Sequence, residues 1–500
     1  MSFSRLWSFM AVVLPVLAAL LATVSTVDLA YQVRAGQLML DQGSILRADP
    51  FTFTAGGQPW LDQQWGAQVV FALIYRATGW AGLAVVRALL VGLVVGFAYL
   101  ACRREGAAGR VAAWLTLAGF GVAAIALGMR PQLIGMVLFA ATLLVLAGRE
   151  RSPRSAWIVP VLVVVWANVH GSFFLGPLAV GAACLEDVVE HRPWSRSLFI
   201  VGVVSVVATV VSPFGIGVWS YALGIAGDPV IRRIVSEWQP TSPTTVPGLL
   251  FYGSAAIVVV LMLTGRRAGR FDPSDPPAGD LPAPITVPWP RIAWLVGLFA
   301  VAALTQRGIA WWALAAPVAV APLAARLVER RSSAAALAGR PSPPEPVSRL
   351  NTIVVALLVL VCVGLLPMWR SSDPLAGPAG LLTDAPTGIA DHLAALATPA
   401  DRVWNAQGWG SWLELTVPGV PLAVDSRIEV IPAAAWEDAL ALDGGPADWA
   451  AILDRWHVTI VVASRVEQGA LIPLLEAGSG WHVAYEDADG AIFVRNGAAG

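Results

Sequence analysis

The chain has 500 residues, of which 57% are hydrophobic and only 13% charged, and its mean hydropathy is +0.69. A soluble protein of this length cannot bury so much apolar surface, so the composition predicts a polytopic α-helical membrane protein. The net charge of -1 and the lack of a basic tract interleaved with aromatic residues give no reason to expect a nucleic-acid partner.

Long apolar segments recur along most of the chain. A bilayer core of about 30 Å requires roughly 20 apolar residues per helix, and this length predicts about 11 transmembrane helices. The candidate spans are residues 6–27, 80–101, 111–129, 133–148, 156–170, 173–188, 197–212, 248–265, 290–305, 309–327 and 351–369. Segment 64–77 is too short to span and is predicted to form a helix that lies in the membrane interface.

The arginines predict the orientation of these spans. When the spans alternate from a cytoplasmic start, most loop arginines fall on the inner side, which is the positive-inside pattern. We therefore expect a multi-pass protein of the cytoplasmic membrane, with the N-terminus inside and the C-terminal part outside.

The domain organisation follows from where the apolar spans end. Residues 1–370 are predicted to form a transmembrane domain with a first outer loop at 28–79, and residues 371–387 a linker. Within residues 388–500, short strands are predicted at 402–405, 421–425, 458–463, 481–486 and 491–495, and they alternate with helices predicted at 388–398, 433–442, 446–456 and 466–478. That alternation predicts a small extracytoplasmic α/β domain with a mixed sheet.

Polar side chains that could carry chemistry gather in the predicted outer loops. Asp28 follows the first apolar run, and Asp62 lies in the same outer loop, so either carboxylate could act as a general base. Cationic and hydrogen-bonding side chains could bind a donor phosphate or another part of a substrate, and tryptophans could stack against a sugar ring. The candidates are Arg34, Arg130, His170, Arg307, Glu237, Trp60 and Trp65.

Each of these residues also has a structural explanation. Asp28 could end a membrane helix or begin the next element, and Trp60 and Trp65 could anchor the chain in the interfacial aromatic belt. Glu237 could pair with Arg232 or Arg233. His170 could be a satisfied residue at a helix end.

The sequence identifies no certain cofactor. Asp62 could hold a divalent metal, but no cluster of ligands supports a metal site, and the three cysteines lack metal-ligand spacing.

The whole arrangement resembles the GT-C superfamily of integral membrane glycosyltransferases, and most closely a bacterial group within it. The resemblance covers nearly the whole chain. It is carried by Asp28 to Gly36, by Asp49-Pro50-Phe51-Thr52-Phe53-Thr54 with Trp60 and Trp65, by Trp166-Ala167-Asn168-Val169-His170-Gly171, by Pro213-Phe214-Gly215, by Glu237-Trp238-Gln239-Pro240, by Trp409-Gly410-Ser411-Trp412 and by Asp425-Ser426-Arg427.

The resemblance implies an inverting transfer of a sugar from a polyprenyl-phosphate donor to a glycan, lipid or protein acceptor of the cell envelope, at the outer face of the membrane. It implies Asp28 as the general base and membrane lipid as a partner. Leu29 stands where related mannosyltransferases have a second acidic residue. Two alternatives stay open: a lipid-linked oligosaccharide polymerase or ligase that relies on arginines, and a non-catalytic membrane scaffold or transporter.

Two further features of the C-terminal part allow more than one interpretation. Asp425-Ser426-Arg427 could bind acceptor or donor, or could form a salt bridge at the end of a strand. Trp404, Trp409 and Trp412 could bind glycan or dock this domain on the membrane part.

Overall fold

A computed structural model describes residues 1–227, 232–233, 235–267, 287–337, 347–369 and 380–497. The chain divides into two compact units. Unit 1 comprises residues 1–22, 84–222 and 232–369, and unit 2 comprises residues 23–83, 223–231 and 370–500.

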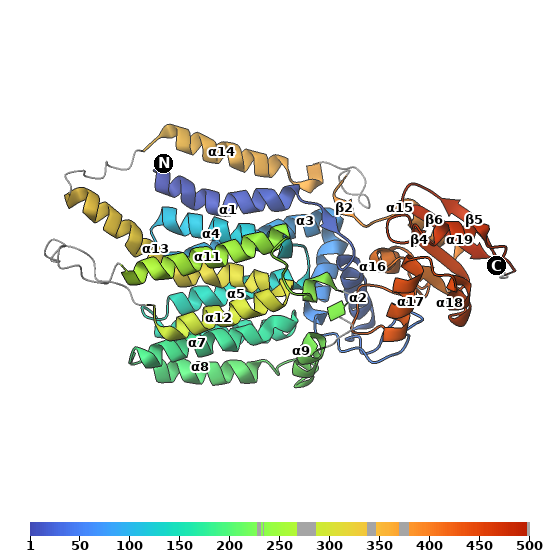
Figure 1. The fold of residues 1–500 in the computed structure, drawn as a ribbon, viewed down its shortest axis with the longest axis horizontal. Coiled ribbons are helices and arrows are strands. Elements are labelled where there is room, and N and C mark those ends of the chain that lie inside the picture. The colour runs from blue at the N-terminus through green and yellow to red at the C-terminus, as the bar shows by residue number, and fades with distance from the viewer. Residues whose placement is uncertain (228–231, 234, 268–286, 338–346, 370–379, 498–500) are drawn as a thin grey trace. The chain divides into compact units, whose positions relative to one another are not determined.

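Unit 1 is a bundle of apolar helices that lie side by side (Figure 1). Its helices, including those that continue into unit 2, are α1 (Phe3–Leu21), α3 (Trp65–Arg104), α4 (Gly109–Ala123), α5 (Pro131–Ala147), α6 (Ile158–Ala167), α7 (Leu175–Val189), α8 (Ser195–Ala208), α9 (Gly217–Gly227), α11 (Val246–Arg267), α12 (Trp289–Leu304), α13 (Ile309–Leu337) and α14 (Arg349–Gly364).

Every predicted span coincides with one of these helices, so the prediction of a polytopic α-helical membrane protein is confirmed. Among the described residues, six helical segments are long and apolar enough to cross a membrane, and five further apolar helices have 10–17 residues. Length and apolar composition therefore identified the bundle.

The predicted first span is longer than the helix that forms. Helix α1 ends at Leu21, and the next residues leave the helix as β1 (Val24–Ser25), which pairs in parallel with β2 (Leu382–Thr383). The Thr26 hydroxyl donates to the carbonyl of Asp384 at 2.6 Å. The backbone N–H groups of Val24 and Thr26 donate to Leu381 and Thr383 in this pairing rather than within a continued helix. Asp28 therefore does not end a membrane helix.

Segment 64–77 is helical, as predicted, and is continuous in the chain with the second span. Both belong to α3, and the helical conformation is interrupted at Gly79, where φ is 62° and ψ is −158°. A residue with a Cβ is strained at such a positive φ, so glycine separates the two parts of α3. Its position at the membrane interface stays a prediction.

An ion-pair network closes one end of unit 1. Arg291 pairs with Glu105 at 2.8 Å and with Glu186 at 2.6 Å, and Arg149 pairs with Asp187 at 3.0 Å. All of these groups except Asp187 border a cavity of about 70 Å³ whose other walls are mainly leucine and alanine. Arg149 lies two residues after the end of α5 and Arg130 immediately precedes its start, so the network lies about one helix length, roughly 25 Å, from Arg130.

Unit 2 contains a small α/β fold. Strands β3 (Val403–Asn405), β4 (Ile460–Ser464), β6 (Gly490–Arg495) and β5 (Trp481–Glu486) form the sheet in that order. Strand β3 is parallel to β4, whereas β6 is antiparallel to both of its neighbours, so the predicted mixed sheet is confirmed. The helices are α15 (Thr387–Leu396), α16 (Gln407–Thr416), α17 (Ala433–Asp443), α18 (Trp449–Arg455) and α19 (Ile472–Ala477).

Two details of this part differ from the prediction. Residues 421–425 do not form a strand of the sheet; Leu422 makes single bridges to Val403 and Thr52 instead. Helix α16 was not predicted, because Gly408 and Gly410 weaken its helical pattern.

The first loop belongs to unit 2 together with the C-terminal residues. Its helix α2 (Leu29–Gln42) and the segment that follows it pack into this unit. Backbone bonds join Phe53 N to Leu422 O at 2.9 Å and Leu422 N to Phe51 O at 3.2 Å. The predicted domain boundaries stay a prediction, and residues 371–379 of the predicted linker lie outside the described residues.

Candidate active site

Three loop ends of unit 1 bring two arginines to one carboxylate. Arg130 immediately precedes α5, with Pro131 at the first helical position, Glu237 lies in the short helix η4 (Ser236–Trp238), and Arg307 lies in η6 (Gln306–Gly308). Arg130 Nη1 is 2.5 Å from Glu237 Oε1, and Arg307 Nε is 2.9 Å from Oε2. Each guanidinium thus takes one oxygen of the same carboxylate.

The backbone fixes η4 and η6 against each other. Gln306 donates from its backbone N–H to Gln239 O and from its side-chain amide to Ser236 O, both at 3.1 Å. The guanidinium of Arg307 also lies over the Trp238 ring, 5.2 Å from its centroid. The sequence alternative that Glu237 pairs with Arg232 or Arg233 is wrong, because its ion pairs are with arginines from distant loops.

The two arginines keep Glu237 ionised. Burial alone would raise the pKa of its carboxyl, but the charges of Arg307 and Arg130 outweigh that effect and lower the pKa to about 2. All three side chains remain about one-third exposed, so a ligand can reach them.

His170 lies close enough to this cluster to interact electrostatically with Arg307. Burial, and then the charge of Arg307, lower the pKa of His170 to about 3, so its imidazole is neutral at neutral pH. Its Nδ1 accepts the Ser172 backbone N–H at 3.2 Å and lies 2.7 Å from Ser172 Oγ. Nδ1 is therefore the unprotonated nitrogen, and Nε2 carries the proton and can donate.

Unit 2 holds the predicted carboxylates. Asp28 occupies the N-cap position of α2 with φ −99° and ψ −34°, and its side chain makes no capping hydrogen bond to that helix. Asp at the start of an element was one of the two structural explanations for this residue. Its half-buried carboxylate is thus not used to cap α2.

Asp62 is buried, with 2% of its surface exposed, and its Oδ1 accepts from Gln68 Nε2 at 2.8 Å. Burial, together with the charge of Glu429, raises the pKa of Asp62 well above its ordinary value, although Arg427 and hydrogen bonds oppose the shift. Arg34 is half-buried in α2, and burial lowers the pKa of its guanidinium, opposed by Asp41 and Glu414.

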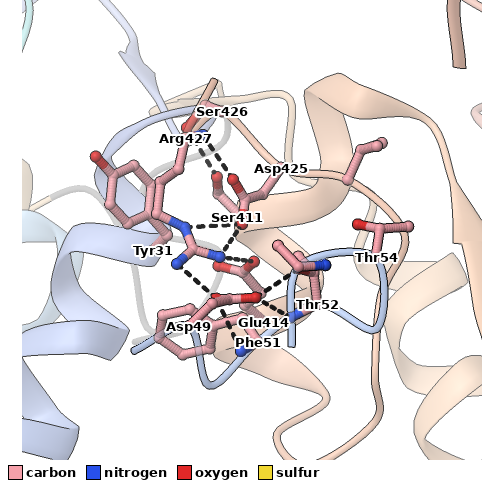
Figure 2. Close-up of polar contacts among 12 residues, drawn as sticks. Tyr31, Asp49, Phe51, Thr52, Thr54, Ser411, Glu414, Asp425, Ser426 and Arg427 are labelled. Carbon is pink, nitrogen blue, oxygen red and sulfur yellow. Dashed lines mark hydrogen bonds and ion pairs between the residues drawn. The ribbon is translucent and has the colours of Figure 1, made fainter. Parts of the chain in front are cut away.

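Arg427 is fully buried in unit 2 among three carboxyl groups (Figure 2), and a salt bridge was one of the two interpretations of its Asp425-Ser426-Arg427 motif. Its Nη1 is 2.7 Å from Asp49 Oδ1, its Nε donates to Asp425 Oδ2 at 2.9 Å, and its Nη2 is 3.8 Å from Glu414 Oε1. The Asp425-Ser426-Arg427 motif is therefore salt-bridged and buried. The resemblance had indicated Asp49 as part of a motif, but Glu414 lies in the unpredicted helix α16.

Trp60 belongs to this buried cluster rather than to an exposed platform. The Arg427 guanidinium carbon lies 4.7 Å from the centroids of both Trp60 and Phe51. Trp60 packs in the core with Tyr31, and the half-buried Trp65 packs against the same cluster. Trp404 and Trp412 are also buried, and the ring centroids of Trp412 and Trp80 are 5.9 Å apart.

No family model and no curated protein matches this chain. Solved structures do match. Apo ArnT from Cupriavidus metallidurans is 17% identical, with a TM-score of 0.50 over 97% of this chain and 96% of ArnT. Arabinofuranosyltransferase AftD from Mycobacteria is also 17% identical, with a TM-score of 0.55 over 99% of this chain and 40% of AftD. The chain has the GT-C fold.

ArnT has also been solved with undecaprenyl phosphate, and that structure matches with a TM-score of 0.49 at 17% identity, over 98% of each chain. The GT-C fold confirms the resemblance from the sequence at the level of the architecture. This chain spans about 40% of the length of AftD.

The structure brings together one group of predicted site residues, and this group lies in unit 1. In unit 1, Arg130, Glu237 and Arg307 form an ion triad with His170 nearby. In unit 2 the structure places Asp28, Arg34, Asp62, Trp60 and Trp65 on α2 and the loop that follows, up to the start of α3. The described residues contain no group of three or more His, Cys, Asp or Glu side chains able to hold a metal ion.

We expect Asp62→Asn to flatten the dependence of stability on pH. Because the pKa of Asp62 is raised in the folded chain, folding takes up a proton at pH values above the ordinary aspartate pKa, and stability falls as the pH rises. Asparagine removes this contribution, which amounts to at most about 1.4 kcal/mol per pH unit. Thermal unfolding in detergent between pH 5 and 8 measures it. The exposed Asp454→Asn is the control, and parallel curves for Asp62→Asn and the parent would contradict the prediction.

Proposed function

We propose that this protein is a glycosyltransferase that transfers a sugar from a polyprenyl-phosphate donor to a cell-envelope acceptor on the outer side of the cytoplasmic membrane. The observation that carries the proposal is the convergence of Arg130 and Arg307 on one carboxylate in a chain with the GT-C fold. Two guanidinium groups that converge on the oxygens of one anion can also bind the oxygens of a phosphate.

We propose Arg130 and Arg307 as the donor-phosphate site. Their side chains come from loop ends of the bundle and are partly exposed, as a site for a lipid-linked phosphate requires. His170 can donate a hydrogen bond from Nε2 to a phosphate oxygen without adding charge. ArnT, whose fold this chain shares, binds undecaprenyl phosphate, and we carry that class of lipid over to this chain as part of the proposal.

The arginine-rich loops support the orientation. The Arg149 network and the Arg130 cluster lie at opposite ends of α5. With the N-terminus inside, the network with Arg149 faces the cytoplasm and the proposed phosphate site faces outward, where lipid-linked sugars are used. The C-terminal residues are then also outside.

The proposed reaction is a single displacement at the anomeric carbon. The acceptor hydroxyl oxygen forms a bond to that carbon, and the bond from the carbon to the phosphate oxygen breaks, with its electron pair leaving on the polyprenyl phosphate. Asp28 accepts the proton of the acceptor hydroxyl as the general base, and the arginines stabilise the negative charge that develops on the leaving phosphate. One displacement inverts the configuration of the anomeric carbon. Asp62 remains a second candidate base, although its burial with Gln68 favours a positioning role.

The direct test is transfer by the purified full chain. It is incubated in detergent with a panel of radiolabelled polyprenyl-phosphate sugars and bacterial envelope extracts. Transfer from at least one donor that depends on the chain is the expected result. No transfer from any donor would instead favour the non-catalytic scaffold or the transporter.

We expect Arg307→Gln to lower kcat/KM about 100-fold. The substitution removes one charged donor to the leaving phosphate, and loss of one such donor typically lowers the rate by a factor of about 100 to 1,000. Arg326→Gln is the matched control, because Arg326 is exposed on α13 and pairs only with the neighbouring Glu329 at 3.3 Å among its described ion pairs. Equal activities of the two variants, measured on protein with unchanged thermal unfolding, would remove Arg307 from the site.

A further inference from the structure

The Arg130–Glu237–Arg307 cluster has a net charge of +1. Both oxygens of Glu237 accept from a guanidinium, at 2.5 Å and 2.9 Å, so the carboxylate bridges two cations. The lowered pKa of Glu237 shows that it stays ionised at neutral pH. A cluster built only to bind a dianionic phosphate would not need the carboxylate, because two arginines already match two negative charges.

The carboxylate leaves part of the cluster available. Glu237 uses Nε of Arg307, and no described hydrogen bond or ion pair uses the two terminal nitrogens of that guanidinium. Arg307 is 35% exposed. A phosphate can therefore bind to Arg307 while Glu237 remains in place, and its oxygens then lie near a fixed negative charge.

The proposed reaction changes the charge of the phosphate. In a polyprenyl-phosphate sugar the phosphorus carries two ester bonds and a single negative charge. When the bond to the sugar breaks, the product is a monoester, and a phosphate monoester carries about −1.5 to −2 at pH 7 because its second pKa is near 6. Donor and product thus differ by up to one charge at the same atoms.

We propose that Glu237 determines the selectivity of this site for the charge of the phosphate, so that the site binds the singly charged phosphodiester donor in preference to the doubly charged monoester product. This inference rests on the proposed function. A +1 cluster neutralises the diester, whereas the monoester leaves an unmatched negative charge beside the Glu237 carboxylate, and like charges repel strongly in a partly buried site. Glu237 therefore promotes release of the polyprenyl phosphate after transfer.

A purely positioning role for Glu237 predicts something different. If the carboxylate only holds the two arginines in place, its loss weakens the binding of monoester and diester alike. If it sets the charge selectivity, its loss strengthens the binding of the monoester relative to the diester. The ratio of the two affinities therefore distinguishes these roles, whereas either affinity alone does not.

The test compares two ligands on the full chain in detergent at pH 7.5: farnesyl monophosphate and its methyl phosphodiester. Their dissociation constants are measured by calorimetry for the parent, Glu237→Gln and Glu237→Ala. The control is Glu329→Gln, whose carboxylate is exposed and pairs with Arg326. For both Glu237 variants, we expect the ratio of the diester dissociation constant to the monoester dissociation constant to be at least tenfold higher than for the parent. The control should have the same ratio as the parent.

The pH dependence provides a second readout. Below pH 6 the monoester carries one negative charge, so the added preference of the Glu237 variants for it should shrink. An unchanged affinity ratio in folded Glu237 variants, or equal weakening of both ligands, would overturn the inference and leave the donor site intact. Failure of both ligands to bind any folded form, including the parent, would overturn the proposed phosphate site itself.

Discussion

Replacement of Arg427 by methionine is expected to destabilise unit 2 by about 3–5 kcal/mol, the usual cost of removing one partner from a buried ion pair. Methionine fills much of the space between Trp60 and Phe51 but leaves Asp49 and Asp425 without their cation. The effect should be largest on the loop that carries Asp49. Thermal unfolding and limited proteolysis of residues 43–64 measure it.

The electrostatics of this cluster explain why the loss should be large. Three carboxyl groups meet one arginine. Burial and the charge of Asp425 raise the pKa of Glu414 well above its ordinary value, whereas Arg427 holds the pKa of Asp425 low against the effect of burial. Of these two carboxyl groups, Glu414 is thus the one whose charged form is disfavoured. Asp49 and Asp425 depend on Arg427 for compensation of their charge.

The control for Arg427→Met is Arg465→Met, because Arg465 is 40% exposed and pairs with Glu486 at the surface. Such pairs contribute roughly 0–1 kcal/mol. A second variant, Arg427→Met with Asp49→Asn, should recover part of the lost stability, since it removes one uncompensated charge. If Arg427→Met unfolds like the parent, or if neutralising Asp49 changes nothing, the cluster does not hold the loop.

The sequence predicted those parts of the fold that depend on local pattern. Apolar runs of membrane length predicted the bundle, and alternation of strand and helix predicted the small α/β part. The predicted ends of elements were less accurate. After Leu21 the chain leaves the helix, and Val24 and Ser25 pair with Leu382 and Thr383, which are far away in the sequence. No local pattern around residues 22–28 encodes that partner.

The charged clusters show the same limit. The sequence indicated Arg130, Glu237 and Arg307 individually, and their residue types suited a phosphate site. However, Glu237 is 107 residues from Arg130 and 70 residues from Arg307 in the sequence. The arginines nearest to it in the sequence were therefore the wrong partners. The union of the Asp49 loop with Arg427 joins still more distant segments. Only the tertiary structure could show these pairs.

The second large effect concerns Asp28. We expect Asp28→Asn to lower kcat about 1,000-fold, within the factor of 100 to 10,000 that a general base typically contributes. Asparagine has nearly the same shape but cannot accept the proton of an acceptor hydroxyl at neutral pH. Thermal unfolding of Asp28→Asn is compared with that of the parent, so that a loss of transfer is assigned to the chemistry only where the two unfold alike. Radiolabelled transfer under saturating donor measures kcat.

The control for Asp28→Asn is Asp41→Asn on the same helix, where the carboxylate is 58% exposed and pairs with Arg76 at 2.5 Å. It should transfer sugar like the parent. Comparison with Arg307→Gln then separates two mechanisms. Loss of transfer in both Asp28→Asn and Arg307→Gln supports base-assisted displacement from a phosphate donor. Full transfer by Asp28→Asn together with loss in Arg307→Gln would remove Asp28 from the mechanism and favour a polymerase or ligase that relies on its arginines alone.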